Sequence, residues 1–183
     1  MHSCAAMGHV VSVILVTDGE AAHHTVTDLA ATRRRELAAA LAHLSPNPVP
    51  CHRLRIADGE VTANESYVQR AIEARMPAGA ALVGPFECDG HADHDAVGRA
   101  CVRIARMQHQ TLGRYPIWAW HHCLPHVFSS SRIVRFALSV QAQRAKARAI
   151  SCFASQLEGT KSEAVVPAHV LMYFARPFET FLL

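Results

Sequence analysis

The side chains best suited to chemistry in this sequence lie in one short segment, Asp89-Gly90-His91-Ala92-Asp93-His94. In the spacing His-x-Asp-His, one imidazole can coordinate a metal ion directly while the carboxylate orients or charges a neighbouring imidazole. A polar loop in which Asp93 or Asp95 merely caps the following helix fits the same residues equally well. The segment therefore raises the hypothesis of a metal site without establishing one.

A complete metal site needs more than this segment. A catalytic zinc ion normally takes three protein ligands and leaves one position for water, so His94, alone or with His91, requires partners from elsewhere in the chain. His121 and His122 come at the end of a predicted strand, where alternation would turn one of the two toward the pocket. This pair provides the better second candidates.

Asp18 and two adjacent histidines are weaker candidates for the same pocket. Asp18 ends the first predicted strand and can approach the same sheet edge, although capping of the turn that it begins is the more economical explanation. His23 and His24 follow on the next loop, where adjacent histidines are more often solvated. These residues stay open as pocket residues.

The strands and helices that must position these side chains follow from the apolar pattern. Val10 to Val16 is a nearly continuous apolar run, typical of a parallel strand that is covered on both faces. The other predicted strands are Cys51–Ala57, Ala80–Phe86, Pro116–His121, Ile133–Leu138 and Phe178–Leu182. The predicted helices are Met1–His9, Thr27–Leu44, Asn64–Arg75, Asp95–Gln110 and Gln141–Leu157.

This alternation of strands and helices predicts an α/β fold with a Rossmann-like, mostly parallel sheet flanked by helices. In such sheets the active site lies beyond the carboxyl ends of the strands. The Asp89–His94 segment falls between a predicted strand and a predicted helix, which is the expected place for a ligand. With 183 residues, half of them hydrophobic, the chain suits a single domain over residues 1–183.

Composition and missing motifs exclude several other functions. Lys and Arg number 18 against 15 Asp and Glu, a net charge of +3 that is too small to indicate nucleic-acid binding. No apolar stretch approaches the roughly 20 residues of a membrane span, and no signal peptide is evident, so we expect a soluble, cytoplasmic protein. The six cysteines never form Cys-x-x-Cys, and the serine-hydrolase, dinucleotide-binding and phosphate-loop motifs are absent.

Further segments, in order along the chain, carry a resemblance to a known family. They are Gly8–Val13 with Val16–Glu20, Arg33–Leu37 with Ala39 and Ala40, Asp58-Gly59, His91–His94 with Val97-Gly98, Lys146–Ala149 with Ser155-Gln156, and Arg176–Glu179. Together they resemble the LmbE/PIG-L family of metal-dependent N-deacetylases over nearly the whole chain.

The resemblance implies an enzyme that removes the acetyl group from N-acetylglucosamine-type substrates or related amides with a zinc-bound water. It implies that His94 is a metal ligand and that His91 acts as an acid or stabilises the oxyanion, with Asp93 tuning His91. It also implies a small N-acetylated amino-sugar-type substrate as the binding partner.

The sequence departs from the family at one motif. The family's first strand ends in His-Pro-Asp-Asp-Glu, which supplies a His ligand, an Asp ligand and the Asp general base, and that motif does not occur here. It would precede Met1, so we expect an N-terminally truncated domain without the first strand. Zinc, or another divalent metal, would then bind weakly or not at all, and the exposed strand edges predict lower stability or self-association.

Three hypotheses follow. The first is a zinc-dependent N-deacetylase, inactive in this form if the missing segment is required. The second is a non-catalytic α/β remnant or binding module with the same fold. The third recruits Asp18, His121 or His122 as replacement ligands.

Overall fold

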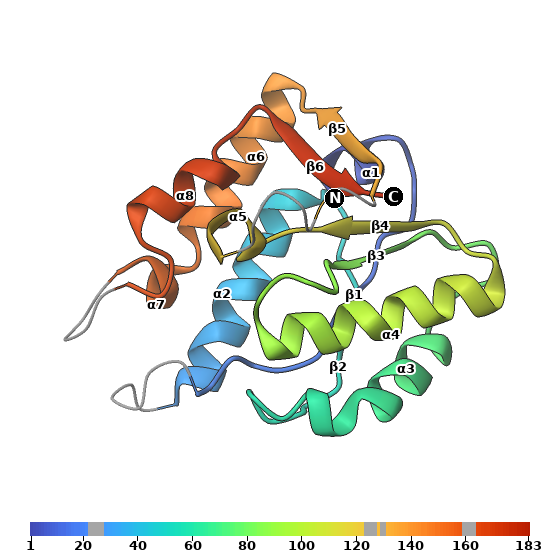
Figure 1. Cartoon of the computed structure of the whole chain (residues 1–183). Helices are drawn as coiled ribbons and strands as arrows, with labels where there is room; N and C mark the ends of the chain where they lie inside the picture. Colours follow the sequence, from blue (N-terminus) through green and yellow to red (C-terminus); the bar gives the residue numbers. More distant parts are fainter. Residues whose placement is uncertain (22–27, 123–127, 129–130, 159–163) are drawn as a thin grey trace. The chain divides into compact units, whose positions relative to one another are not determined.

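The structure is a computed structural model that describes residues 1–21, 28–122, 128, 131–158 and 164–183 (Figure 1). It divides into two compact units. The first unit comprises Met1–Arg55 with Ala137–Glu179, and the second comprises Ile56–Phe136 with Thr180–Leu183. The expectation of a single domain stays a prediction.

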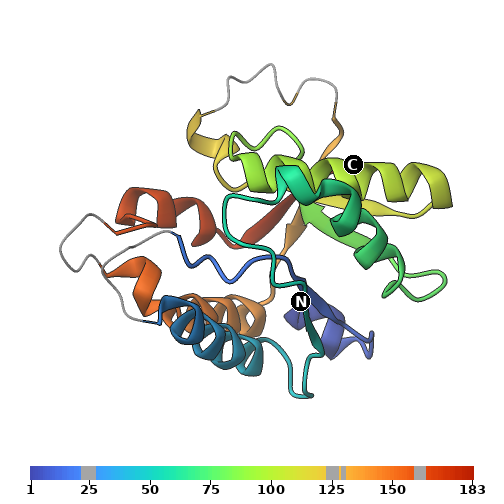
Figure 2. The ribbon, with the colours of Figure 1, turned by 90° about the horizontal axis from the view of Figure 1, so that it is seen from below.

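The first unit is built around two helices that lie side by side, α2 (Leu29–Leu44) and α6 (Val140–Ser151), drawn in blue and orange in Figure 2. Two short parallel strands belong to the same unit, β1 (Val13–Leu15) and β2 (Cys51–Arg53). The remaining helices of this unit are α1 (His2–Ala6), α7 (Ala154–Leu157) and α8 (Ala168–Phe174).

Local sequence explains where the two main helices begin and how they pack. The Asp28 carboxylate accepts the Ala31 N–H at 3.3 Å, and the Ser139 hydroxyl accepts the Ala142 N–H at 3.2 Å, so each helix has a side-chain N-cap. The buried face of α6 consists of the small residues Ala142, Ala145 and Ala149, which let α2 approach closely. The Glu36 carboxylate of α2 also accepts the backbone N–H and the hydroxyl of Ser155, each at 2.7 Å.

The second unit contains most of a four-stranded sheet in the order β3-β4-β6-β5. β3 (Leu82–Pro85) and β4 (Leu112–Tyr115) are parallel, whereas β4 and β6 (Phe178–Leu182) are antiparallel. β5 (Ile133–Ala137) lies at one edge of this sheet and β3 at the other. The helical elements of the unit are η1 (Thr62–Asn64), α3 (Glu65–Glu73), α4 (Ala92–Gln108) and α5 (Ala119–His122).

The α4 helix packs against strand β3 of the sheet and against helix α3. Figures 1 and 2 both show α3 beside α4. Its buried stripe, Ala96, Ala100, Cys101 and Ile104, has the spacing of one helix face. Val68, Ala71 and Ile72 are the buried residues of α3. This packing fixes the start of α4, and with it the histidine segment, against the end of β3.

The mixed α/β class predicted from the sequence is confirmed: the structure has parallel strand pairs flanked by helices. Instead of one mostly parallel sheet, the described residues form a two-stranded and a four-stranded sheet, the latter with an antiparallel pair. The predicted long helix Gln141–Leu157 is two helices, α6 and α7. Among the described helices, none combines the length and the apolar character that a bilayer span requires.

The predicted strand Pro116–His121 is wrong. The strand is Leu112–Tyr115, and residues Ala119–His122 form the short helix α5, so His121 and His122 lie on a helix rather than at a strand end. Pro116 has no N–H to donate to a sheet. The next three backbone N–H groups donate to the Asp89 carboxylate instead, which turns the chain away from the sheet.

Candidate metal-binding loop

The histidine segment lies where two neighbouring parallel strands end. The loop from Phe86 to His91 follows β3, and the residues from Pro116 onward follow β4, its parallel partner. Because parallel strands end at the same edge of the sheet, these two connections come together beyond the carboxyl ends, where α/β proteins bind ligands. The predicted location of the segment is therefore confirmed by the backbone.

Asp89 links the two connections. Its side chain is fully buried, and its oxygens accept the backbone N–H groups of Ile117 at 2.6 Å, Trp118 at 3.0 Å and Ala119 at 3.0 Å. The same carboxylate contacts the His94 ring, with 2.7 Å between Asp89 Oδ2 and His94 Nδ1. Asp89 thus holds the end of the β4 connection and one imidazole at the same time.

These contacts decide the charge of Asp89. Burial alone would raise the pKa of its carboxyl, since it removes the charged form from water. The hydrogen bonds from His94 and from the three backbone N–H groups outweigh burial, and the pKa of Asp89 lies below its ordinary value. The side chain is accordingly a carboxylate at neutral pH.

The other residues of the segment are held by the local fold. His91 precedes the first residue of α4 and is exposed, and its ring centroid lies 4.5 Å from that of His94. The Asp95 carboxylate accepts the backbone N–H groups of Asp89 at 2.7 Å and Gly90 at 3.2 Å. Two imidazoles therefore stand side by side on a loop whose backbone is fixed by carboxylates.

Asp93 fixes a third stretch of backbone. It is 5% exposed, and its oxygens accept the N–H groups of Gly59 at 2.7 Å and Val61 at 3.2 Å. These bonds anchor the chain that leads into α3. The predicted tuning of His91 by Asp93 stays a prediction.

Gly98 allows this part of α4 to approach the end of β3. A Cβ atom at this position would lie 2.6 Å from the Glu87 Cα and 2.8 Å from the Pro85 carbonyl oxygen. Because His94 lies one helical turn before Gly98, this contact sets how close the imidazole comes to the loop that carries Asp89.

The chemistry of this loop suits one metal-ligand position. A histidine that donates from Nδ1 to a carboxylate presents Nε2 to solvent, which is the usual arrangement of a zinc-binding imidazole. The His94 side chain is 27% exposed, so the ring is open to a ligand. Within the described parts of the chain, however, no group of three or more His, Cys, Asp or Glu side chains is placed to hold a metal ion. The described residues fit one ligand and do not make a whole site.

The other predicted pocket residues lie on α5 and in the first unit. His121 lies on α5, where its ring meets Trp118 edge-on with 6.3 Å between centroids, and His122 ends that helix. Asp18 belongs to the first unit. Its carboxylate forms ion pairs with Arg53 and with Arg34, two guanidinium groups that any metal ion would have to displace. The candidates His23 and His24 lie outside the described residues.

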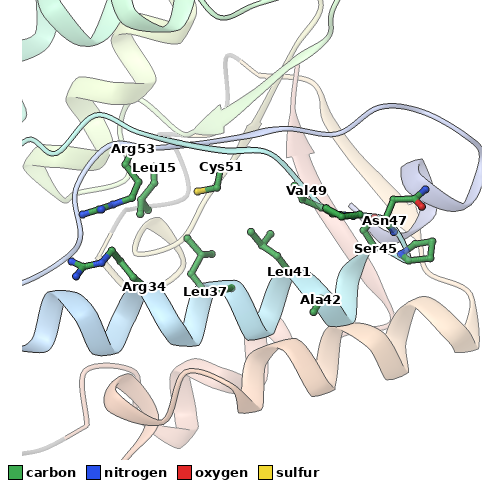
Figure 3. A pocket seen from close by; sticks show the side chains of 13 residues that line it. Leu15, Arg34, Leu37, Leu41, Ala42, Ser45, Asn47, Val49, Cys51 and Arg53 are labelled. Atoms are coloured by element: carbon green, nitrogen blue, oxygen red, sulfur yellow. Dashed lines mark hydrogen bonds between the residues drawn. The ribbon is translucent and has the colours of Figure 1, made fainter.

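A groove of about 500 Å³ lies in the first unit, between α2 and the strand pair (Figure 3). Leu37 and Leu41 of α2 and Leu15 of β1 give it apolar walls, and Arg34 and Arg53 stand at one end. The side chains of both arginines bond to Asp18. Asp18 therefore serves to hold the two arginines at this end of the groove.

Sequence reasoning did not assign a role to Asp89, although it named the residue. Its relevant partners, Ile117 to Ala119, are 28 to 30 residues away in the sequence, and no local pattern reveals a contact of that range. The one available signal is that Asp89 lies on the polar loop that follows a predicted strand.

The protein thus has an α/β fold, and a loop with histidine and aspartate side chains lies beyond the C-terminal ends of two parallel strands. Residues 1–105 match the sequence model of PIG-L, GlcNAc-PI de-N-acetylase. This match spans more than half of the 183 residues, and the chain belongs to the PIG-L family of metal-dependent deacetylases. The family predicted from the sequence motifs is thereby confirmed.

A solved structure shares the fold. The chain is similar to teicoplanin deacetylase Orf2, as seen in the crystal structure of its zinc-inhibited form, with a TM-score of 0.67 and 16% sequence identity. The similarity covers 99% of this chain and 89% of that chain. At this identity it shows a common fold and associates zinc with the relative. No curated protein matches the chain.

Proposed function

We propose that this chain is a metal-dependent N-deacetylase, which hydrolyses the N-acetyl amide of a small amino-sugar-type substrate. The proposal rests on the position and the hydrogen bond of the His94 imidazole. The buried Asp89 carboxylate holds its Nδ1 at 2.7 Å, at the sheet edge where α/β enzymes bind ligands. Membership of the PIG-L family supplies the reaction class.

Each residue of the loop has a role in this proposal. His94 presents Nε2 to the metal ion. A zinc ion at this position would lower the pKa of a bound water and polarise the amide carbonyl. His91, exposed beside His94, donates a proton to the leaving amine or a hydrogen bond to the oxyanion. Asp93 keeps the neighbouring backbone in place through Gly59 and Val61.

The proposal also concerns the protein ligands that the metal ion needs besides His94. Since no group of three or more His, Cys, Asp or Glu side chains in the described parts of the chain can hold a metal ion, we propose that a segment of the His-Pro-Asp-Asp-Glu type completes the site. The 183-residue chain would then bind zinc weakly and show low activity, and a longer form with that segment would be fully active.

Release of acetate tests this function. The 183-residue chain and a longer form with the His-Pro-Asp-Asp-Glu strand are each incubated with N-acetylglucosamine conjugates, with zinc and with a chelator. We expect zinc-dependent acetate from the longer form, loss of this activity in His94→Gln, and no change in His43→Gln, a control at an exposed histidine of α2.

Two outcomes would count against the proposal. Acetate release that does not depend on zinc or on His94 would exclude the assigned site. Substrate binding without acetate release, even in the longer form, would instead support the second hypothesis, a non-catalytic binding module of the same fold.

A further inference from the structure

We propose that Asp89 is a positioning residue that fixes the tautomer and orientation of the His94 ring. Through Oδ2 it keeps the proton on His94 Nδ1, so that Nε2 carries the lone pair that a metal ion binds. This inference rests on the proposed function for its purpose, but the state of the ring can be measured without metal or substrate.

The geometry of the pair supports this role. A carboxylate has acceptors and no donor, so the 2.7 Å contact between Asp89 Oδ2 and His94 Nδ1 requires the proton on Nδ1. Of the two ring nitrogens of a neutral histidine, the one that is protonated is set by the hydrogen bond that the ring makes. The Asp89 contact therefore leaves Nε2 unprotonated.

The carboxylate itself cannot rotate away. Asp89 Oδ1 accepts the N–H groups of Ile117 and Ala119, and Oδ2 accepts that of Trp118. With its side chain fully buried, Asp89 has no solvent into which it could turn. The three backbone N–H groups thus fix the Asp89 carboxylate, and this carboxylate in turn fixes the His94 ring.

The other carboxylates of the loop are used differently. Both oxygens of Asp93 accept backbone N–H groups from residues 59 and 61. Asp95 accepts backbone N–H groups through Oδ1. Of these three carboxylates, Asp89 is the one that hydrogen-bonds to an imidazole within the described residues. The positioning role falls on Asp89 and not on the aspartate inside the His-x-Asp-His motif.

Exchange of Asp89 for Asn changes the contact to His94 and can keep two of the three backbone hydrogen bonds. The Asn Oδ1 can still accept from Ile117 and Ala119, while the Nδ2 group in place of Oδ2 becomes a donor and no longer accepts the Trp118 N–H. It would donate to His94 Nδ1 and transfer the ring proton to Nε2, the nitrogen that must stay free for the metal. Asp89→Asn therefore predicts the opposite tautomer in a similar fold.

The tautomer is read by 15N NMR of the imidazole nitrogens in the metal-free chain, at a pH of about 8 to 10 where an ordinary histidine is neutral. The His94 signals are assigned among the 13 histidines by their loss in His94→Gln. We expect protonated Nδ1 in the wild type and protonated Nε2 in Asp89→Asn. Asp95→Asn is the control: its amide oxygen can still accept the N–H groups of Asp89 and Gly90, so the His94 ring should keep the wild-type tautomer.

Zinc affinity provides the second readout. Loss of a hydrogen-bonding partner of a metal-binding histidine costs about 10- to 100-fold in metal affinity, so we expect this decrease in Asp89→Asn and none in Asp95→Asn. A wild-type ring protonated on Nε2 overturns the inference, whether or not Asp89→Asn folds. An unchanged tautomer in a folded Asp89→Asn also overturns it.

The two proposals fail in different ways. Protonated Nδ1 in a chain that binds no zinc, even in the longer form, would overturn the deacetylase proposal and leave the positioning of His94 intact. Zinc-dependent activity with a ring protonated on Nε2 would do the reverse.

Discussion

Exchange of Gly98 for Ala tests how closely α4 must approach the end of β3. In the structure a Cβ at this position would lie 2.6 Å from the Glu87 Cα, 2.7 Å from the Glu87 nitrogen and 2.8 Å from the Pro85 oxygen. All three atoms belong to the backbone, so no side-chain rotation can relieve the contact. The helix or the loop must move.

Two effects of opposite sign decide the size of the change. Ala is favoured over Gly inside a helix by about 1 kcal/mol. Insertion of a methyl group into a tightly packed site costs about 1–3 kcal/mol, and backbone contacts this short place Gly98 at the upper end. We expect Gly98→Ala to lower the free energy of unfolding by about 2 kcal/mol.

Urea unfolding at neutral pH measures this change through the midpoint, with the slope unaltered. Gly113→Ala is the matched control, because its Cβ would meet Phe181 Cδ1 at an ordinary 3.4 Å and two side-chain atoms further away. The control should equal the wild type or gain up to about 1 kcal/mol. If Gly98→Ala proves as stable as the wild type, the reasoning about close approach is refuted.

Other predictions follow from the buried carboxylates and thiols. Asp93→Ala leaves two backbone N–H groups without their acceptor and should lower the free energy of unfolding by about 2–3 kcal/mol in urea; an unchanged midpoint would show that these bonds contribute nothing. Because the pKa of Asp89 is lowered in the folded chain, its stabilisation is present above the unfolded-state value of about 4 and is lost as the pH falls through the folded value. The difference in unfolding free energy between the wild type and Asp89→Asn should thus shrink below about pH 4, and a constant difference from neutral to acid pH would contradict the assigned ionisation. Burial raises the pKa of the Cys101 thiol to about 12, so Cys101 should react with iodoacetamide only after unfolding, whereas the exposed Cys4 reacts in the native state; mass spectrometry of the labelled peptides decides this, and native labelling of Cys101 would refute it.

Local signals predicted much of the fold. The cap at Asp28 and the proline that follows Leu44 by two residues mark the limits of α2. The predicted strand Phe178–Leu182 is β6. The strand predicted at Pro116–His121 was wrong because its N–H groups bond to Asp89, a partner that lies far away in the sequence. Periodicity records only local spacing, so it could not detect this bond.

The sequence likewise predicted one part of the candidate site and missed another. The spacing of His91, Asp93 and His94 indicated a loop suited to metal binding at a sheet edge, and the backbone places this loop at such an edge. Which carboxylate holds which imidazole depends on the packing of α4 against the end of β3. That packing follows from Gly98 and from the connection after β4, and the motif alone does not contain it.

Zinc titration of the longer form that carries the His-Pro-Asp-Asp-Glu segment tests most directly the central claim, which is that His94 is a metal-binding imidazole. Calorimetry of the wild type, His94→Gln and the control His43→Gln compares three folded chains that differ by one side chain. The account predicts that His94→Gln binds zinc more weakly than the wild type, while His43→Gln equals it. Equal affinity in His94→Gln and the wild type would contradict the claim.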